Sequence, residues 1–336
     1  MRIQDAIAAL LGGRDLDSAE IEGVFAAIMR GEATPAQIGG LLVALRARGE
    51  TVDEIVGAAR AMRAHARTIR PRTEPLVDTC GTGGDGSGTF NISTAAALIA
   101  AGAGLGVAKH GNRAMSGSVG GADVLELLGV RIDLEPERVA ACIDAVGIGF
   151  LFAQVFHPAM KHAAAPRREL GVRTIFNLLG PLSNPAGVRR QVIGLFSPDW
   201  LEPMAAALDR LGSEHALVVH GAGGLDEISL CGPTAVVELR RGATARFDIA
   251  PEDFGMERCR IDDLRVAGGE ESAAAIRAVL AGESGPRADV AVLNAAAVLY
   301  VGGAAADIAA GVDVARAAIA SGAAAACLQR WIEATR

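Results

Sequence analysis

The feature that most constrains this chain is a change of hydrophobic pattern at the two prolines of residues 70–75. Before it, three segments each place a capping side chain three residues ahead of a Glu or Gln, which is typical of helix starts. These starts are Asp17, Thr34 and Thr51. Together with residues 3–11 they predict four helices and no strand. A pair of prolines among charged residues indicates a linker or hinge.

Beyond the linker, short β-rich runs alternate with helical segments, which is typical of a sheet flanked by helices. We expect strands near residues 76–78, 106–108, 191–195, 216–219 and 235–239, and helices at 305–320 and 322–334. The predicted fold is a small N-terminal helical domain, residues 1–70, hinged to a larger α/β domain, residues 71–336. Its central sheet is expected to be mixed, mostly parallel and flanked by helices.

Composition and charge exclude several classes of protein. The chain is 51% hydrophobic and 21% charged, with a formal net charge of −7. An acidic balance argues against general nucleic-acid binding, which needs a basic surface. Five cysteines without CxxC or zinc spacing indicate reduced thiols in a cytosolic protein. No signal peptide or membrane span is evident, so we expect a cytoplasmic protein with neither nucleic-acid nor membrane partners.

The most informative segment is a glycine-rich loop between an expected strand and an expected helix. The strand ends at Cys80, the loop covers residues 81–89, and residues 91–94, Asn-Ile-Ser-Thr, open the helix. Glycines let backbone N–H groups approach an anion, and a helix N-terminus adds a partial positive charge. The loop lacks the Walker A and Rossmann patterns. It predicts a phosphate site of another kind.

A second polar cluster, residues 109–117, follows the next expected strand. Lys109 and Arg113 supply positive charge, and Asn112 and Ser116 supply neutral donors. Two cations soon after a phosphate loop suit a diphosphate better than a carboxylate. His110 alone is ambiguous, because a loop histidine more often packs or hydrogen-bonds than catalyses. Residues 120–123 begin a further helix whose N-terminus offers another anion contact.

Two more segments complete the pattern. Adjacent carboxylates, Asp226 and Glu227, lie on a glycine-rich loop after an expected strand. Magnesium prefers a few carboxylates together with waters and phosphate oxygens, although such a pair alone is more often a solvated turn. The segment 167–185 contains arginines suited to an acidic substrate and a proline-bounded turn. Arg168 and Glu169 fit a solvated surface equally well.

These four segments, in this order, resemble the anthranilate phosphoribosyltransferase family. The resemblance rests on residues 81–85, 91–94, 109–113, 173–185 and 224–227 and covers nearly the whole chain. It implies the type III phosphoribosyltransferase fold, with an active site between the two domains and a homodimer formed through the helical domain. The implied enzyme is a magnesium-dependent pentosyltransferase of tryptophan biosynthesis, joining phosphoribosyl pyrophosphate to the amino group of anthranilate.

The resemblance also assigns residues to roles. It implies catalytic roles for Lys109, His110 and Arg113. Magnesium, expected as two ions with the phosphoribosyl donor, would be held by Ser93, Asp226 and Glu227. Anthranilate would contact Gly81, Asn112 and Arg167. The donor-binding residues would be Gly81, Gly84, Asp85, Thr89, Asn91, Ile92, Ser93, Thr94, Lys109, His110, Gly111, Asn112, Arg113, Ala114, Met115, Ser116, Gly117 and Gly121.

One stretch departs from the family pattern. Ser118 stands where the family usually has lysine, and Gly121 stands at a hydroxyl position. These changes predict weaker side-chain contacts to the donor, or an altered substrate in a divergent relative.

Two alternatives remain at this stage. One is a pyrimidine nucleoside phosphorylase of the same fold, which the Asp226–Glu227 pair and residues 173–185 disfavour. The other is a non-catalytic relative that binds nucleic acid, which the retained cation and carboxylate motifs and the negative charge disfavour.

Overall fold

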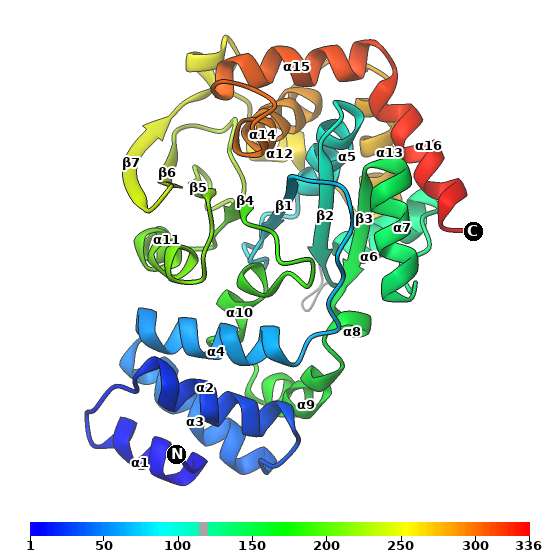
Figure 1. The fold of residues 1–336 in the computed structure, drawn as a ribbon. Coiled ribbons are helices and arrows are strands. Elements are labelled where there is room, and N and C mark those ends of the chain that lie inside the picture. Colours follow the sequence, from blue (N-terminus) through cyan, green and yellow to red (C-terminus); the bar gives the residue numbers. More distant parts are fainter. Residues whose placement is uncertain (114–119) are drawn as a thin grey trace.

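The computed structural model describes residues 1–113 and 120–336. Its N-terminal part is a layer of four helices, α1 (Ile3–Leu11), α2 (Ser18–Met29), α3 (Pro35–Arg48) and α4 (Val52–Ala64), at the lower end of Figure 1. The three predicted capping boxes are present. In one, the Gln37 side chain accepts a hydrogen bond from Thr34 N at 2.9 Å. Each box satisfies backbone donors that a helix start leaves unpaired.

The α/β part is built on one seven-stranded sheet in the order β3-β2-β1-β4-β5-β6-β7. The first five strands in this order run parallel, and β6 and β7 are antiparallel additions. The expected mixed, mostly parallel sheet is therefore confirmed. The strands are β1 (Leu76–Gly81), β2 (Gly106–Gly111), β3 (Ile148–Phe152), β4 (Arg190–Gly194), β5 (His215–Gly221), β6 (Thr234–Arg240) and β7 (Ala243–Ile249).

Two strands were not predicted. β3 follows α7 (Pro136–Val146) with only Gly147 between them, and its five residues are all buried. A short buried apolar run after a helix has no alternation that distinguishes it from more helix. β7 lies at the sheet edge and is exposed along most of its length, so it lacks the hydrophobic pattern of a strand.

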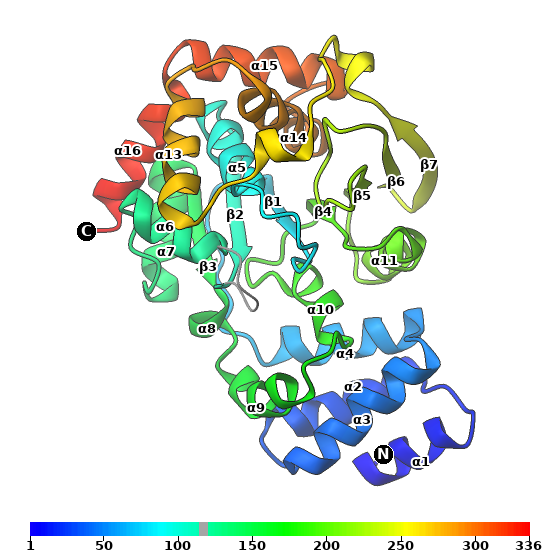
Figure 2. The ribbon, with the colours of Figure 1, turned by 180° about the vertical axis from the view of Figure 1, so that it is seen from behind.

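Helices cover both faces of the sheet, as Figures 1 and 2 show from opposite sides. The C-terminal helices match the prediction closely, except that α15 begins at Ile308 rather than residue 305. The remaining helices are α5 (Ile92–Gly102), α6 (Gly121–Leu128), α8 (Ala153–Phe156), α9 (Lys161–Leu170), α10 (Phe176–Leu179), α11 (Leu201–Arg210), α12 (Ile261–Leu264), α13 (Gly269–Leu280), α14 (Pro286–Gly302), α15 (Ile308–Ala320) and α16 (Ala323–Ala334).

Side-chain alternation along the strands divides the core in two. On β4 and β5, Val192 and Leu217 belong to the core cluster that contains α5 and α14. Their neighbours Ile193 and Val218 belong to a second cluster with α11 and the N-terminal helices. Because successive strand residues point to opposite faces, the sheet is buried on both sides. It is a rigid base for the loops at its ends.

After β3 the chain returns to the helical layer, which the sequence pattern did not predict. Residues 153–183 form α8, α9 and α10, and Figures 1 and 2 both place α9 beside the N-terminal helices. The Phe25 and Phe176 rings lie 5.4 Å apart. Arg63 Nε donates a hydrogen bond to Leu182 O at 2.6 Å. The helical layer therefore contains chain from both sides of the linker.

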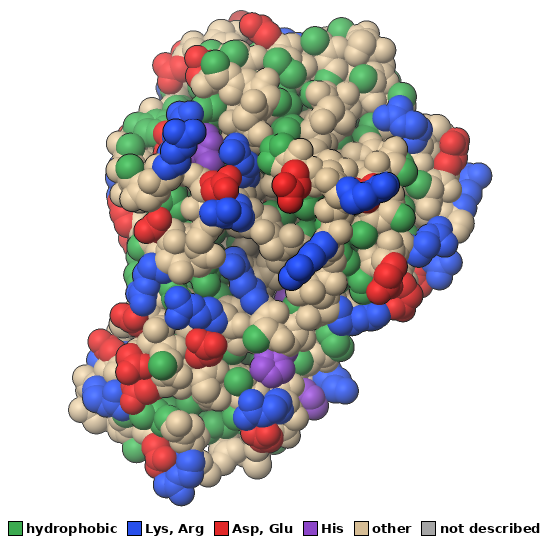
Figure 3. Space-filling view, in the orientation of Figure 1, with side chains coloured by type: hydrophobic (Ala, Val, Ile, Leu, Met, Phe, Trp, Pro, Cys, Tyr) green, Lys and Arg blue, Asp and Glu red, His purple; other side chains and the backbone are tan. Residues whose placement is uncertain are grey.

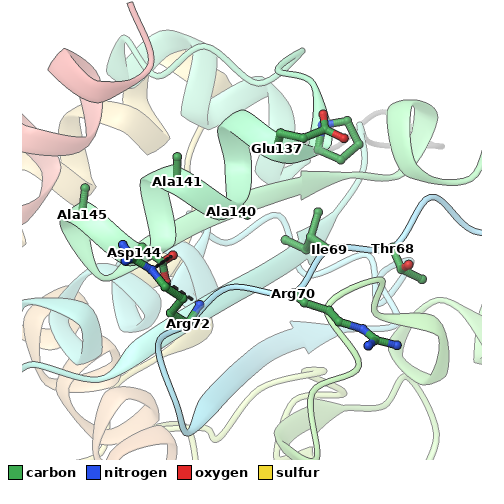
Figure 4. Close-up of a pocket in the computed structure, with 10 residues that line it drawn as sticks. Thr68, Ile69, Arg70, Arg72, Glu137, Ala140, Ala141, Asp144 and Ala145 are labelled. Atoms are coloured by element: carbon green, nitrogen blue, oxygen red, sulfur yellow. Dashed lines mark hydrogen bonds and ion pairs between the residues drawn. The ribbon is translucent and has the colours of Figure 1, made fainter.

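The linker between α4 and β1 is held at both ends. Arg67 N donates to Phe156 O at 2.8 Å, and Thr73 N donates to Asp144 Oδ1 at 2.9 Å. A cavity of about 490 Å³ lies between the linker and α7. In Figure 4 the Arg72 side chain reaches Asp144 while that of Arg70 points away. This cavity belongs to the linker and does not include the strand ends discussed below.

Within the described residues, no single helix combines the length and apolar character needed to cross a bilayer. In the part of the chain that the structure describes, one helix pair, α15 with α16, meets those criteria when taken together, and it is bent by 65° at the break.

Candidate active site

The strand order reverses between β1 and β4, whose carboxyl ends lie side by side at Gly81 and Gly194. From β1 the chain adds β2 and β3 on one side, and then returns to add β4 and β5 on the other. In parallel α/β sheets, ligands bind where the strand order reverses in this way. Thr82 N donates to Gly194 O at 2.9 Å, so the glycine-rich loop leaves β1 directly beside the end of β4.

The Asp226 loop fits closely against these two strand ends. Asp226 Oδ2 accepts a hydrogen bond from Gly83 N at 2.6 Å. A Cβ atom on Gly81 would overlap the Asp226 carboxylate, and one on Gly194 would overlap the Asp226 backbone carbonyl. Glycine is therefore required at both strand ends so that the carboxylate can reach the phosphate loop. The predicted proximity of residues 81–85 and 226–227 is present in the structure.

Glu227 and Lys109 meet at the N-terminus of α5. Glu227 Oε1 accepts a hydrogen bond from Ser93 N at 3.1 Å. Lys109 Nζ, which is buried, donates to Ser93 Oγ at 3.1 Å and to Thr79 O at 2.8 Å. Asn91 is the N-cap, because its Oδ1 accepts from Thr94 N at 3.0 Å. Three segments far apart in sequence therefore converge on Ser93.

Buried charges at this point are crowded. Burial raises the pKa of Asp226, and the nearby Asp85 charge raises it further. Burial also raises the pKa of Glu227, with Asp226 as the next contributor. Burial lowers the pKa of Lys109, opposed by the charge of Asp78. A cation would favour the ionised carboxylates, since an opposite charge offsets their cost of desolvation.

The phosphate loop is shaped by glycines and is supported by a segment far from it in the sequence. Gly83, Gly84, Gly86 and Gly88 have φ values between +69° and +72°. Such values are costly for other residues, and they let successive backbone N–H groups turn toward one concave side. Arg265 Nε donates to Ser87 O at 2.9 Å, and Val266 N donates to Gly88 O at 3.0 Å. The loop is therefore supported by the segment after α12.

His110 has a partner that the sequence analysis missed. Its ring lies 5.1 Å from that of His157, and the Nε2 atoms of both are buried without a hydrogen-bond partner in the structure. Burial lowers the pKa of His110 to about 3 and that of His157 to about 4. Both imidazoles are therefore neutral at pH 7. Had β3 been predicted, a histidine soon after its carboxyl end would have been a candidate.

A buried network positions His110. Its backbone N donates to Asp78 Oδ1 at 3.1 Å, and its Nδ1 lies 3.1 Å from Gly180 O. Asn184 Nδ2 donates to Asp78 Oδ2 at 2.8 Å and to Ala108 O at 2.8 Å. The turn after α10 is thereby fixed against β1 and β2, which explains the Pro181–Asn184 pattern in the sequence.

The segment after β2 reaches α6. Arg113 donates to Asp123 at 2.7 Å and to Glu126 at 2.6 Å, and its guanidinium lies over the Phe152 ring. Asn112 O accepts from Ala122 N at 3.3 Å. Gly121 lies near Asn91 and Thr94. The expected donor contacts Ala114, Met115, Ser116 and Gly117 lie outside the described residues.

Two arginines come from α9 and from the residues directly after it. Arg167 lies over the Phe176 ring at 4.8 Å, and burial lowers its pKa. Arg173 donates to Gly84 O at 3.1 Å and lies over Phe196 at 4.3 Å. In the sequence Arg173 is only part of a motif, and its contact with the phosphate loop depends on the fold. Figure 3 shows Lys and Arg side chains gathered where the α/β part meets the helical layer.

The oxygen atoms that could ligate a metal here suit magnesium better than a softer metal. Outside residues 114–119, no group of three or more His, Cys, Asp or Glu side chains is placed to hold a metal ion. The groups present are the buried Asp226 carboxylate, the half-buried Glu227 carboxylate and the Ser93 hydroxyl beside a glycine loop. Magnesium commonly takes one or two carboxylates and completes its shell with water and phosphate oxygens, so these residues fit that ion.

Comparison with known proteins agrees with this geometry. Residues 4–66 match the model of the glycosyl transferase family helical bundle domain, and residues 73–325 match that of its a/b domain. The anthranilate phosphoribosyltransferase of Thioalkalivibrio sulfidiphilus is 56% identical over 335 residues, covering 100% of this chain and 99% of that protein. The chain belongs to the anthranilate phosphoribosyltransferase family.

Solved structures of anthranilate phosphoribosyltransferases share the whole fold. The enzyme from Thermus thermophilus superposes with a TM-score of 0.94 at 50% identity, covering 99% of both chains. The Saccharomyces cerevisiae enzyme in complex with PRPP and Mg gives 0.91 at 28% identity, covering 99% of this chain and 97% of that one. The expected family, fold and enzyme class, a pentosyltransferase, are confirmed. The roles of individual residues stay predictions.

Proposed function

We propose that this chain transfers the phosphoribosyl group of phosphoribosyl pyrophosphate to the amino group of anthranilate, releasing pyrophosphate, in tryptophan biosynthesis. The observation that carries the proposal is the convergence of three segments on Ser93. Lys109 and Glu227 meet there at the start of α5. The adjacent Asp226 accepts a hydrogen bond from Gly83 N of the glycine loop. A phosphate loop, a buried cation and buried carboxylates are the groups that a metal-bound diphosphate requires.

The donor would bind along the glycine loop and the start of α5. Gly81, Gly84, Asp85, Thr89 and residues 91–94 supply the loop and helix contacts in this proposal, and residues 109–117 with Gly121 supply the opposite side. Support comes from the left-handed glycines of the loop and from the N-terminus of α5, where backbone N–H groups and the helix dipole favour an anion.

We assign magnesium, as two ions carried with the donor, to Asp226, Glu227 and Ser93. The support is chemical, because burial and then a neighbouring carboxylate raise the pKa of each of the two side chains, and a bound cation would offset both effects. Magnesium bound there would neutralise charge on the diphosphate as the leaving group departs. A magnesium complex of the yeast relative with PRPP is consistent with this assignment.

Anthranilate would bind on the side that faces α9, near Gly81, Asn112 and Arg167. The Arg167 guanidinium is partly desolvated by burial, and it lies over an aromatic ring. It therefore suits the carboxylate of an aromatic acid. His110 and His157 are neutral and present buried ring nitrogens, which suits contact with an uncharged aromatic amine.

The chain's own residues would act in three ways during the transfer. Lys109 and the backbone N–H groups of the loop would stabilise negative charge that grows on the leaving diphosphate. Arg113 would contribute a further positive charge. Anthranilate's amine is neutral at pH 7, so its lone pair attacks without prior deprotonation, and His110 would accept the proton after the C–N bond forms. Orientation of the two substrates supplies much of the remaining rate enhancement.

The wider assignments are proposals of the same kind. We place a division near residue 71, with closure about the linker assembling the site and excluding water. Homodimerisation through the helical layer and a cytoplasmic location follow the family expectation.

Anthranilate fluorescence tests the function directly. Anthranilate emission should fall when the protein, phosphoribosyl pyrophosphate and MgCl₂ are all present, and the fall should stop on adding EDTA. Thymidine and uridine should show no phosphorolysis under the same conditions. Unchanged anthranilate emission with a folded protein would refute the proposal, and pyrimidine release would favour the nucleoside phosphorylase alternative.

A further inference from the structure

Two of the five cysteines lie side by side near the magnesium loop. Cys231 follows Glu227 by four residues, and Cys259 lies between β7 and α12. Cys259 N donates a hydrogen bond to Leu230 O at 3.1 Å, so the two chain segments are paired at this point. Both residues are half-buried and both thiols are free.

The Cys231 and Cys259 thiols are neighbours, since each residue lies at or next to the backbone hydrogen bond that joins the two segments. Burial raises the pKa of Cys259 to about 12, and the neighbouring Cys231 thiol raises it through charge and a side-chain hydrogen bond. Disulfide formation requires neighbouring backbones, and the hydrogen bond from Cys259 N to Leu230 O brings Cys259 to the residue next to Cys231. Of the other three cysteines, Cys142 and Cys327 are buried and each thiol bonds to a backbone carbonyl. Cys80 is half-buried and lies in β1.

The pair joins two segments that both support the candidate site. Cys231 belongs to the loop that carries Asp226 and Glu227, and its backbone N donates to Ser229 Oγ at 2.9 Å. Five residues after Cys259, Leu264 O accepts a hydrogen bond from Phe90 N at 3.0 Å. Next to it, Arg265 supports the phosphate loop at Ser87. A covalent link at this position would tie the carboxylate loop to the support of the phosphate loop.

We propose that Cys231 and Cys259 form a reversible disulfide site that responds to a peroxide. Both S–H bonds break and one S–S bond forms, while the O–O bond of hydrogen peroxide is cleaved. The two thiols lose two electrons, the peroxide gains them, and both thiol protons end in water. Two thiols and one peroxide give one disulfide and two water molecules. A small dithiol reverses the reaction by exchange.

Peptide mapping of the full-length protein tests the site. The reduced protein is treated with hydrogen peroxide, its remaining thiols are blocked with N-ethylmaleimide, and its peptides are analysed without reduction. We expect two of the five thiols to be lost and one cross-linked species joining the Cys231 and Cys259 peptides. Dithiothreitol should restore both thiols.

Cys142 and Cys327 in the same chain are internal controls, and they should remain free to react with the blocking reagent after unfolding. Cys231→Ser and Cys259→Ser should each abolish the cross-link. The proposal is overturned if Cys231 and Cys259 stay reduced, if they oxidise separately to sulfinic acids, or if the cross-link joins other cysteines. Because the wild-type mapping decides the matter, poor folding of a variant does not obscure it.

Discussion

Arg167 and Arg168 are adjacent in the sequence but differ in their surroundings. Arg167 is partly buried over Phe176, whereas Arg168 is exposed. A guanidinium held against an aromatic ring is pre-oriented for a planar carboxylate. The pair therefore offers a test with a matched control.

Arg167→Ala should raise the KM for anthranilate much more than the KM for the donor. Loss of a charge-assisted contact costs about 1.5–3 kcal/mol, or roughly tenfold to a hundredfold in KM. Steady-state kinetics with each substrate varied in turn measure this, and Arg168→Ala should leave both constants nearly unchanged. Equal increases in the two KM values for Arg167→Ala would remove the proposed carboxylate contact.

His157 allows a prediction about pH. Burial lowers its pKa to about 4, against about 6.5 in the unfolded chain. Protons therefore bind the unfolded state more tightly, and the stability due to the neutral imidazole is present above pH 6.5 and lost as the pH falls toward 4. Between pH 7 and pH 5 this loss is about 2 kcal/mol.

His157→Asn should make the free energy of unfolding less dependent on pH over the same interval. Urea unfolding at pH 7 and pH 5 measures the difference, and comparison within each protein removes any constant effect of the substitution. The same acid-induced loss in the variant and the wild type would show that His157 is not the titrating group.

At the residue scale, the sequence predicted the groups that form recognisable motifs. Lys109, Ser93 and the Asp226–Glu227 pair were named, and the structure brings them together. His157 and Arg173 were not assigned, because their importance comes from neighbours supplied by distant segments. A single histidine or arginine in a loop carries no information about such neighbours.

At the scale of elements, the helix starts were the most predictable features. The capping boxes at Asp17, Thr34 and Thr51 are local hydrogen-bond patterns within four residues, so sequence is sufficient to find them. β7 was missed because edge strands need little hydrophobic alternation. β3 was missed because complete burial removes that alternation.

The start of α6 contains Gly121, one of the positions at which the sequence predicts a departure from the family pattern. A Cβ at Gly121 would lie 3.7 Å from Thr94 Oγ1, which is an ordinary contact distance, so a small side chain fits. Thr94 Oγ1 is buried and has no hydrogen-bond partner in the structure. A hydroxyl at position 121 would therefore face the proposed donor site and the Thr94 hydroxyl, which has no hydrogen-bond partner among the described residues.

Gly121→Ser should lower the KM for phosphoribosyl pyrophosphate, by up to about tenfold for one added hydrogen bond. The KM for anthranilate should change little. Gly121→Ala is the control, because it adds the Cβ without the hydroxyl. An equal change in the two variants would mean that the hydroxyl makes no contact with the donor.

At the scale of the whole molecule, sequence predicted the two parts and the class of the sheet but not the strand order. The candidate site depends on β1 and β4 being neighbours although β2 and β3 lie between them in the chain. That pairing is set by packing among residues far apart in sequence. For the same reason the return of residues 153–183 to the helical layer was unpredictable. The family resemblance supplied what local patterns do not contain.

Calorimetric titration of phosphoribosyl pyrophosphate into the protein, with and without MgCl₂, tests the central claim most directly. Binding should require magnesium, and the double variant Asp226→Asn with Glu227→Gln should weaken it by roughly tenfold to a hundredfold. The variant should fold normally, because burial already disfavours the ionised carboxylates that it removes. Equally tight binding without magnesium, or an unchanged affinity in the folded variant, would contradict a metal-bound diphosphate held at this convergence of loops.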